Sequence, residues 1–441
     1  MPDATANLSD MALLEGCQKA AFSYFAENVN EANGLVADTS RQGSPVSIAV
    51  VGFALSCYPI GVERGWISRE HAARLTLAAL RFFHRSTQSA DEDVTGYQGF
   101  YYHFLDMQSG LRVWQSELSM VDTGLLMAGM LVAGSYFDRT GEAEIRDLAD
   151  ALYRRVDWAW AQGGATTLRL GWRPKSGFLN YGWDGYNEAT KLYVLAAASP
   201  DHPISEDCYA GWTATYQWEN IYGFNVLYGG PLFMHQFSHA WIDFAGIRDA
   251  FMREKSSDYF ENSRNSTLLH REYARRNPGG FAGYGEDLWG LSACDGPGWF
   301  RDTVDGERRS FFGYAARGVP FGPDDGTIAP WSWLASLPFA PDLALSAVRH
   351  LIAHYPLVAP GLRMPGAFNP ALAGRRGFGA DGWISQGFYG LDQGITTMMI
   401  ENHRSGMIWE LMRANAYIRD GLRRSGFGGG WLERGAARHD G

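Results

Sequence analysis

Apolar residues recur at three- and four-residue steps along most of the chain, the spacing that places side chains on one face of an α-helix. Ser68 is a helix N-cap candidate, and Ala72, Leu75, Ala79 and Phe83 follow it at such steps. Few segments alternate strictly between apolar and polar residues, so we expect strands only as short hairpins in loops. The same periodicity predicts further helices near residues 9–28, 47–60, 118–137, 142–161, 186–198, 204–217, 231–244, 257–276, 342–354, 393–404 and 406–424.

The predicted helices are of two kinds. Those near 47–60 and 118–137 are rich in glycine and alanine, and small side chains permit the close approach of two helix backbones. We expect these helices to be buried on most sides. The helices near 142–161 and 257–276 carry arginine and glutamate on one face, which is typical of external helices.

The alternation of buried and amphipathic helices predicts an all-α fold, an (α/α)6 barrel in which inner helices are ringed by outer ones. No Pro/Ser-rich linker divides the chain. We therefore expect residues 1–441 to form one domain, with flexible ends at about 1–8 and 426–441. In such a barrel, the loops that lead into the inner helices would line a single cleft. A stacked α-solenoid is the alternative, but the chain has no fixed-period repeat to support it.

Composition narrows the range of partners. The chain has 38 Lys and Arg against 48 Asp and Glu, a formal net charge of −10, and it contains no basic block. We therefore expect neither nucleic acid nor an anionic membrane as a partner. An acidic surface with 16 Trp, 21 Tyr and 25 Phe suits a neutral polyhydroxylated ligand better. The four cysteines are far apart, which excludes the spacing of a zinc cluster and predicts reduced, mostly buried thiols.

The N-terminal sequence bears on localisation. Residues 1–30 lack a basic segment followed by an apolar core. No run of the chain approaches the ~18 apolar residues of a membrane span. We therefore expect a soluble protein, cytoplasmic as the sequence stands and periplasmic if a signal peptide has been removed. The sequence predicts no particular oligomeric state.

One segment combines adjacent carboxylates with glycine and aromatic residues. Glu286 and Asp287 lie between Gly285 and Gly290. Tyr284 precedes them, and Trp289 and Trp299 follow. Carbohydrate sites need both features, because aromatic faces stack on sugar rings and carboxylates bind hydroxyls or carry out acid–base chemistry. The alternative is a helix start, at which the two acids would only interact with the positive end of the helix dipole.

Similar units of acid, glycine and aromatic residues recur along the chain. A barrel would bring them to one mouth, and glycosidic cleavage needs one protonated and one ionised carboxyl group. Each acid also has an interpretation without catalysis. Asp184 and Asp325 precede glycines and could simply form turns. Asp392 could cap a helix, and Glu188 could interact with a helix dipole. Asp122 is harder to explain in this way, because burial of an unpaired carboxylate is costly. The acids of these further units are Glu117, Asp122, Asp184, Glu188, Asp243, Asp325 and Asp392.

Two histidines have the spacing of a metal motif. His235 and His239 lie four residues apart, as in the zincin motif HExxH, but Gln236 stands where the general-base Glu would be. A metalloprotease is therefore not expected, and we predict neither a metal nor a cofactor. The two histidines are expected to donate hydrogen bonds to sugar hydroxyls or to neighbouring acids.

Several units resemble, in consistent order, those of the bacterial glucoamylase-like domain, a group that includes the β-1,2-glucanases of glycoside hydrolase family 144. The resemblance extends from about Ser47 to Glu410 and implies an (α/α)6 barrel that hydrolyses β-1,2-glucan without a metal. Cys294 departs from the pattern, which has Ser there, and this change would affect only a subsite. The matching units are WDGYNEA (183–189), HQFSH (235–239), YFENSR (259–264), GYGEDLWGL (283–291), DDGTIAP (324–330) and DQG (392–394).

The resemblance also implies roles for individual residues. The general acid of the inverting members is matched by Glu188, and a late Asp implicated in activating water is matched by Asp392. Glu286 and Glu117 lie in other segments that resemble site loops and are the rival catalytic candidates. A retaining β-1,2-glucan transglycosylase and a non-catalytic glycan-binding barrel are the alternative functions. The expected substrate-binding residues are Asp122, Trp183, Asp184, Tyr186, Asn187, His235, His239, Asp243, Tyr284, Asp287, Trp289, Trp299 and Asp325.

Overall fold

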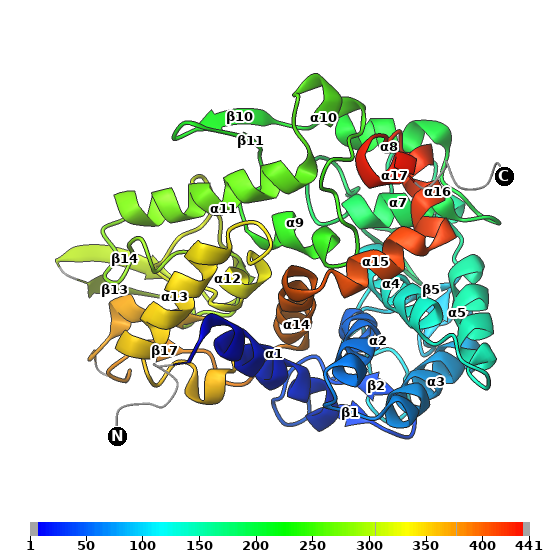
Figure 1. The fold of residues 1–441 in the computed structure, drawn as a ribbon, viewed down its shortest axis with the longest axis horizontal. Coiled ribbons are helices and arrows are strands. Elements are labelled where there is room, and N and C mark those ends of the chain that lie inside the picture. Colours follow the sequence, from blue (N-terminus) through cyan, green and yellow to red (C-terminus); the bar gives the residue numbers. More distant parts are fainter. Residues whose placement is uncertain (1–7, 305, 376, 435–441) are drawn as a thin grey trace. The chain divides into compact units, whose positions relative to one another are not determined.

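The computed structural model describes residues 8–434, apart from residues 305 and 376 (Figure 1). The chain forms two compact units. Of the expected flexible ends, residues 1–7 and 435–441 lie outside the described residues, whereas 426–434 are described and contain α17 (Gly430–Arg434), in which Leu432 is buried. The single-domain organisation stays a prediction. The first unit contains the residues up to Tyr24 together with Trp218–Phe237 and Glu261–Arg404. The second contains Phe25–Gln217, Ser238–Phe260 and the residues from Ser405 onward.

The second unit is built from helices of the two predicted kinds. Helices α2, α4 and α7 are buried along almost their whole length, whereas α3 and α5 bury one face only. Its helices are α2 (Ile48–Glu63), α3 (Arg69–Arg85), α4 (Met120–Tyr136), α5 (Ala143–Arg155), α6 (Trp158–Ala161), α7 (Thr190–Ala198), α8 (Glu206–Thr213), α10 (Ala250–Glu254), α15 (Met407–Ala414), α16 (Ala416–Arg424) and α17 (Gly430–Arg434).

Glycine sets the contact between α2 and α4. A Cβ atom on Gly129 would lie 2.1 Å from the carbonyl oxygen of Gly52, and one on Gly52 would lie 2.3 Å from that of Leu125. Both distances are far below van der Waals contact, so the two helices pack backbone to backbone only because these residues lack side chains. The sequence-based expectation for the small-residue helices is confirmed at this contact.

The first unit has fewer long helices. Helix α14 is buried and packs against α12, which also contacts the amphipathic α13. The amide of Gln18 donates hydrogen bonds to α14, at 2.8 Å to Glu401 and 3.1 Å to the Thr397 carbonyl. The helices are α9 (Phe233–Gln236), α12 (Trp331–Ala335), α13 (Pro341–His354), α14 (Gly390–Arg404) and the 3₁₀ helices η3 (Pro360–Leu362) and η4 (Pro370–Leu372). Helices α1 (Asp10–Glu27) and α11 (Tyr259–Arg276) cross the division between the units.

The strands are short and pair in small antiparallel sheets, as the sequence predicts. In the second unit β1 pairs with β2, β3 with β6 and β4 with β5, while β7, β8 and β9 form a three-stranded sheet. In the first unit the pairs are β10 with β11, β12 with β15, β13 with β14 and β16 with β17. The strands are β1 (Val29–Asn30), β2 (Leu35–Val36), β3 (Val46–Ser47), β4 (Gly96–Tyr97), β5 (Phe100–Tyr101), β6 (Phe104–Leu105), β7 (Leu118–Ser119), β8 (Gly171–Arg173), β9 (Gly177–Phe178), β10 (Trp218–Ile221), β11 (Phe224–Leu227), β12 (Ala293–Cys294), β13 (Phe300–Val304), β14 (Glu307–Phe311), β15 (Ala315–Ala316), β16 (Phe368–Asn369) and β17 (Trp383–Ile384).

Some predicted helices are shorter than expected. The segment 231–244 contains only α9 and the 3₁₀ helix η2 (Phe237–Ala240), and 186–198 is helical only from Thr190. The segment 277–292 contains no helix, so Glu286 and Asp287 do not lie at a helix start. None of the described helices is long and apolar enough to cross a membrane. All four cysteines are buried and free, as predicted.

Candidate active site

The loop that leads into α4 carries two of the candidate acids. Glu117 directly precedes β7, and Ser119 caps α4 by accepting a hydrogen bond from the Asp122 amide at 3.2 Å. The Ser119 hydroxyl also donates to the Asp122 carboxylate at 2.5 Å. Asp122 is therefore fixed in the first turn of a buried helix, where its side chain is only 11% exposed.

His103 connects these acids. Its Nδ1 lies 3.1 Å from Glu117 Oε1 and its Nε2 lies 3.5 Å from Asp122 Oδ2, while its ring stacks on Phe104 at 4.0 Å. Burial alone would lower the pKa of His103, but the charges of Asp122, Glu117 and Asp38 outweigh it and raise this pKa to about 9. We call Asp38, His103, Glu117 and Asp122 the acid cluster.

The carboxyl groups of the acid cluster differ in protonation. The hydrogen bond with His103 lowers the pKa of Glu117 more than burial raises it, so Glu117 is ionised near neutral pH. Burial raises the pKa of Asp38 to about 6, with His103 opposing this rise and Asp122 adding to it. The cluster therefore holds an ionised carboxylate and a carboxyl that titrates near neutral pH around one cation.

Glu188 lies in the turn immediately before α7. Its backbone carbonyl accepts hydrogen bonds from Ser238 Oγ at 2.9 Å and from Lys191 Nζ at 3.1 Å, so the main chain is held on two sides. Burial raises the pKa of its carboxyl, the negative charge of Asp122 raises it further, and Glu188's own amide and Lys191 oppose the rise. Glu188 therefore has the raised pKa that a general acid needs.

Lys191 is an unexpected member of this region. Its side chain is buried, its ammonium lies 5.9 Å from the centre of the Trp241 ring, and burial lowers its pKa. The sequence did not predict Lys191, His103 or Asp38 as site residues. The predicted units were selected for an acid beside glycine or aromatic residues, whereas His103 has aromatic neighbours but no adjacent acid and Lys191 lies within an apolar helix.

The loop 181–188 supplies groups with different environments. Asp184 is exposed and accepts a hydrogen bond from Thr167 Oγ1 at 2.7 Å. Asn187 is buried, and its side-chain oxygen accepts from the Ala189 amide at 2.9 Å, so it shapes the turn before α7. Tyr186 lies among aromatic rings, and Trp183 is half-buried.

His239 and Asp243 are buried in the second unit, contrary to their expected role at sugar hydroxyls. The His239 carbonyl accepts from Trp409 Nε1 at 2.6 Å. Asp243 pairs with Arg413, and its side chain also accepts from the Ala245 amide at 2.9 Å. These contacts tie the segment 239–245 to neighbouring segments, and the role of Asp243 is structural.

His235, in the first unit, is also a core residue. Its Nε2 lies 2.8 Å from the Gly229 carbonyl, and Asn262 and Ser266 lie 3.3 Å from its Nδ1. Burial lowers its pKa to about 4, so the imidazole is neutral. The expectation that His235 binds sugar does not fit a ring that is 1% exposed.

The candidate residues of the segment 283–291 differ in exposure and in their hydrogen-bond partners. Glu286 is exposed and pairs with Arg271 at 3.0 Å. Asp287 accepts from Ser346 Oγ at 2.6 Å, and Tyr284 donates to Asp324 at 2.7 Å. Trp289 is completely buried, so its ring cannot be the stacking face that the sequence suggested.

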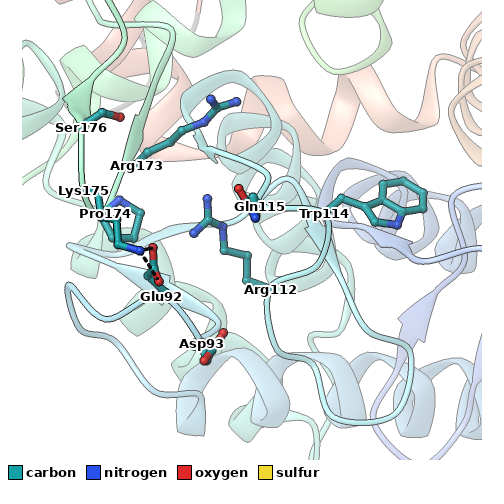
Figure 2. A pocket seen from close by; sticks show the side chains of 9 residues that line it. All are labelled: Glu92, Asp93, Arg112, Trp114, Gln115, Arg173, Pro174, Lys175 and Ser176. Carbon is teal, nitrogen blue, oxygen red and sulfur yellow. Dashed lines mark hydrogen bonds and ion pairs between the residues drawn. The ribbon is translucent and has the colours of Figure 1, made fainter.

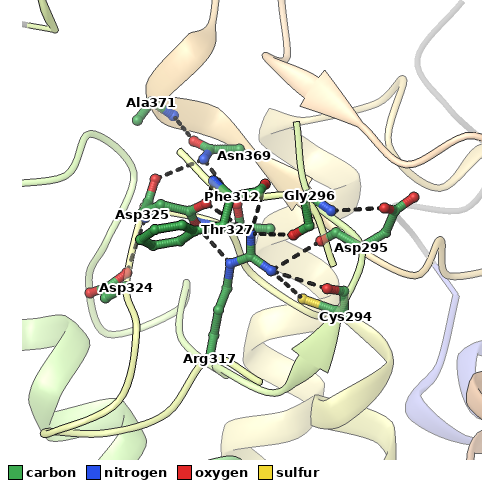
Figure 3. A network of polar contacts seen from close by, with 12 residues as sticks. Cys294, Asp295, Gly296, Phe312, Arg317, Asp324, Asp325, Thr327, Asn369 and Ala371 are labelled. Atoms are coloured by element: carbon green, nitrogen blue, oxygen red, sulfur yellow. Dashed lines mark hydrogen bonds and ion pairs between the residues drawn. The ribbon is translucent and has the colours of Figure 1, made fainter. Parts of the chain in front are cut away.

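Asp325 is the centre of a buried polar network rather than a sugar ligand (Figure 3). Arg317 Nε donates to Asp325 Oδ1 at 2.7 Å and Arg317 Nη2 donates to Oδ2 at 2.8 Å. The same guanidinium donates to the carbonyls of Cys294, Phe312 and Gly313 at 3.0–3.3 Å. We call these residues the Arg317 network, which joins three loops of the first unit.

Two further candidates of the first unit remain suited to a site. Trp299 is 74% exposed and has one ring edge against Phe312. Asp392 lies in the first turn of α14 and is 8% exposed. A Cβ on Gly366 would lie 3.3 Å from Asp392 Oδ2, so the absence of a side chain there leaves room beside the carboxylate. Among the described residues, no three His, Cys, Asp or Glu side chains are grouped to hold a metal ion.

Comparison with known proteins places these observations in a family. Residues 180–416, more than half of the chain, match the family described as "Putative glucoamylase". A curated relative, the exo beta-1,2-glucooligosaccharide sophorohydrolase (non-reducing end) of Parabacteroides distasonis, is 28% identical over 95% of this chain. The chain spans 58% of the length of that relative.

Solved structures show the same fold. A "putative glucoamylase" from Bacteroides uniformis has a TM-score of 0.83 and 30% identity, covering 97% of this chain and 99% of its own. An endo-beta-1,2-glucanase from Chitinophaga pinensis has a TM-score of 0.82 and 26% identity, covering 96% of this chain and 100% of its own. The all-α (α/α)6 fold class and the glucoamylase-like resemblance predicted from the sequence are confirmed.

Proposed function

This chain belongs to the "Putative glucoamylase" family, and we propose that it is a glycoside hydrolase that cleaves β-1,2-linked glucan or its oligosaccharides. The activities of the two relatives, a sophorohydrolase and an endo-beta-1,2-glucanase, support the linkage. One observation carries the chemistry. Glu188 combines a raised pKa with a position close enough to the ionised cluster for the charge of Asp122 to affect it.

Glu188 would act as the general acid. Its proton would pass to the glycosidic oxygen as the bond from that oxygen to the anomeric carbon breaks. A group that is protonated near neutral pH gives up this proton most effectively when its pKa is close to the working pH. Burial of Glu188 and the negative charge of Asp122 both change its pKa in that direction.

A carboxylate would take a proton from the attacking water. Asp392, in the first turn of α14, is the candidate that the family resemblance implies, and the space beside its carboxylate at Gly366 fits this role. Glu117 is the rival, because His103 keeps it ionised. Glu286 is the weakest catalytic candidate, since it is exposed and already paired with Arg271.

The proposed substrate contacts are a reduced set of those expected from the sequence. Asp122, Asp184 and Asp287 have carboxylate oxygens that can accept from sugar hydroxyls. Trp299 offers an open aromatic face, which suits stacking on a pyranose. The expected contacts that also remain proposals are Trp183, Tyr186, Asn187 and Tyr284.

Linkage-defined substrates test the proposal. The purified chain is incubated separately with β-1,2-, β-1,3-, β-1,4- and α-1,4-glucans, and the products are separated by chromatography. We expect sophoro-oligosaccharides or glucose from β-1,2-glucan and little release from starch. Efficient glucose release from starch without action on β-1,2-glucan would contradict the proposal. In a separate incubation with a single sophoro-oligosaccharide, products longer than that oligosaccharide would indicate a transglycosylase instead.

A further inference from the structure

A pocket without an assigned role opens in the second unit beside the loop that leads to Glu117 (Figure 2). Its volume is about 620 Å³. Arg112, Trp114, Gln115 and Arg173 line it, and we call it the Trp114 pocket. Arg173 Nη2 lies 3.8 Å from Glu117 Oε2, so the pocket adjoins the acid cluster.

Aromatic rings connect the Trp114 pocket to the acid cluster. The Trp114 ring lies 5.1 Å from the Phe104 ring, and Phe104 in turn stacks on His103 at 4.0 Å. Trp114 is 70% exposed, although its apolar surface is costly to leave in water. The three rings therefore form a continuous series that begins at His103 of the acid cluster and ends at an open indole.

The backbone at the pocket is held in an unusual conformation. Trp114 and Gln115 have φ angles of 56° and 50°, in the left-handed region that side chains other than glycine rarely adopt. Local hydrogen bonds maintain this turn, from Arg112 Nε to the Ser116 carbonyl at 2.6 Å and from the Ser116 amide to the Val113 carbonyl at 3.1 Å. Backbone strain of this kind is concentrated at binding sites, where it fixes side chains in place.

The polar lining of the pocket fits hydroxyl groups better than an anion. Lys175 is neutralised by Glu92 at 2.9 Å, and Arg173 faces Glu117. Figure 2 shows the Arg112, Gln115 and Arg173 side chains near one another, whereas the Trp114 indole is directed away from them. The loop thus offers hydrogen-bonding groups in the pocket and an open aromatic face beside it, and a sugar chain uses both kinds of group.

We propose that the Trp114 pocket is a distal subsite that binds glucosyl units of the same glucan chain, away from the bond that is cleaved. The inference rests on the proposed function and adds a preference for substrate length. A unit stacked on Trp114 contributes binding energy only when the substrate is long enough to reach from the acid cluster to the pocket. Shorter substrates would be cleaved without this contribution.

Trp114→Ala tests the subsite, with kcat/KM measured on polymeric β-1,2-glucan and on the shortest sophoro-oligosaccharide that the wild type cleaves. We expect kcat/KM to fall about tenfold on the polymer, the loss expected for one aromatic stacking contact, and to be unchanged on the short substrate. Trp114→Phe keeps an aromatic face and should recover most of the loss. Phe321→Ala removes a similarly exposed ring outside the pocket and is the matched control.

The outcomes separate the subsite from the proposed function. Equal losses on both substrates would overturn the subsite, and so would no loss on either. In both cases the effect of the substitution would not depend on substrate length. Thermal unfolding of each variant shows whether it is folded, and Trp114→Leu, which keeps an apolar side chain without an aromatic face, provides the same comparison if Trp114→Ala is not. A wild-type chain that cleaves no β-1,2-glucan would contradict the proposed function, and the subsite with it.

Discussion

The acid cluster of the second unit and the Arg317 network of the first unit both pair acids that the sequence marked as site candidates with one cation. Glu117 and Asp122 lie beside His103, and Asp325 pairs with Arg317. In the Arg317 network, one guanidinium and one carboxylate are fully buried and form two parallel hydrogen bonds. In the acid cluster, His103 is shared among three carboxyl groups and stays 29% exposed.

The number of acids per cation explains the different roles. Asp325 has its own arginine and also accepts from the amides of Phe312 and Thr327, so it is satisfied without a ligand. The acids around His103 share one imidazolium, and their pKa values are shifted in opposite directions: burial raises that of Asp38, and the hydrogen bond with His103 lowers that of Glu117. Opposite shifts of neighbouring acids are typical of sites that transfer protons.

Glu188→Gln is expected to have the largest effect. Glutamine keeps the shape of the side chain but has no acid proton, so kcat on β-1,2-glucan should fall about 10²–10⁴-fold. The melting temperature should change little, since the main chain at Glu188 is held through its carbonyl. Glu286→Gln is the matched control and should keep most activity, because a surface ion pair contributes little. The opposite ranking of the two variants would assign the acid to Glu286.

Arg317→Met should affect stability instead of chemistry. The change leaves the Asp325 carboxylate buried without its partner, which typically costs about 3–5 kcal/mol of unfolding free energy. Chemical denaturation measures this loss, and kcat per folded molecule should stay near the wild-type value. Arg154→Ala removes an exposed pair with Asp201 and serves as the control, with little expected change. Unchanged stability of Arg317→Met would show that the network is not structural.

His103→Gln should alter the pH dependence. Loss of the imidazolium removes the main cause of the low pKa of Glu117, so an acidic limb of kcat that Glu117 sets should move to higher pH. Because folding raises the pKa of His103 from 6.5 to about 9, His103 stabilises the wild type fully below pH 6.5. This advantage over the variant should decline as pH rises and vanish above about 9. Identical profiles of kcat and of unfolding free energy for both proteins would remove His103 from the account.

Local sequence predicted most of the helices but not where they break. The segment 142–161 is divided because Asp157 accepts a hydrogen bond from the Trp160 amide at 2.8 Å and begins α6. The segment 406–424 is divided at Asn415, whose side-chain oxygen accepts from the Tyr417 amide. In both segments a side-chain cap begins a new helix, although the apolar pattern continues across the break.

The candidate site was predicted in part for a related reason. Glu188 and Asp122 were identified because their segments carry the pattern, whereas folding brings His103 to Asp122 and Lys191 to Trp241 from distant segments. Asp325 shares the pattern and yet is structural, because its partner Arg317 lies eight residues away and the sequence gives no sign of the pairing. Partners across the fold decide whether such an acid is reactive.

The measurement that tests the central claim most directly compares two leaving groups. Wild type and Glu188→Gln are assayed on β-1,2-glucan and on an aryl β-sophoroside, whose phenolate leaves without a proton. If Glu188 is the general acid, the variant should lose about 10²–10⁴-fold on the glucan and far less on the aryl substrate. Equal losses on the two substrates would contradict the account, because they would mean that Glu188 does not supply the proton.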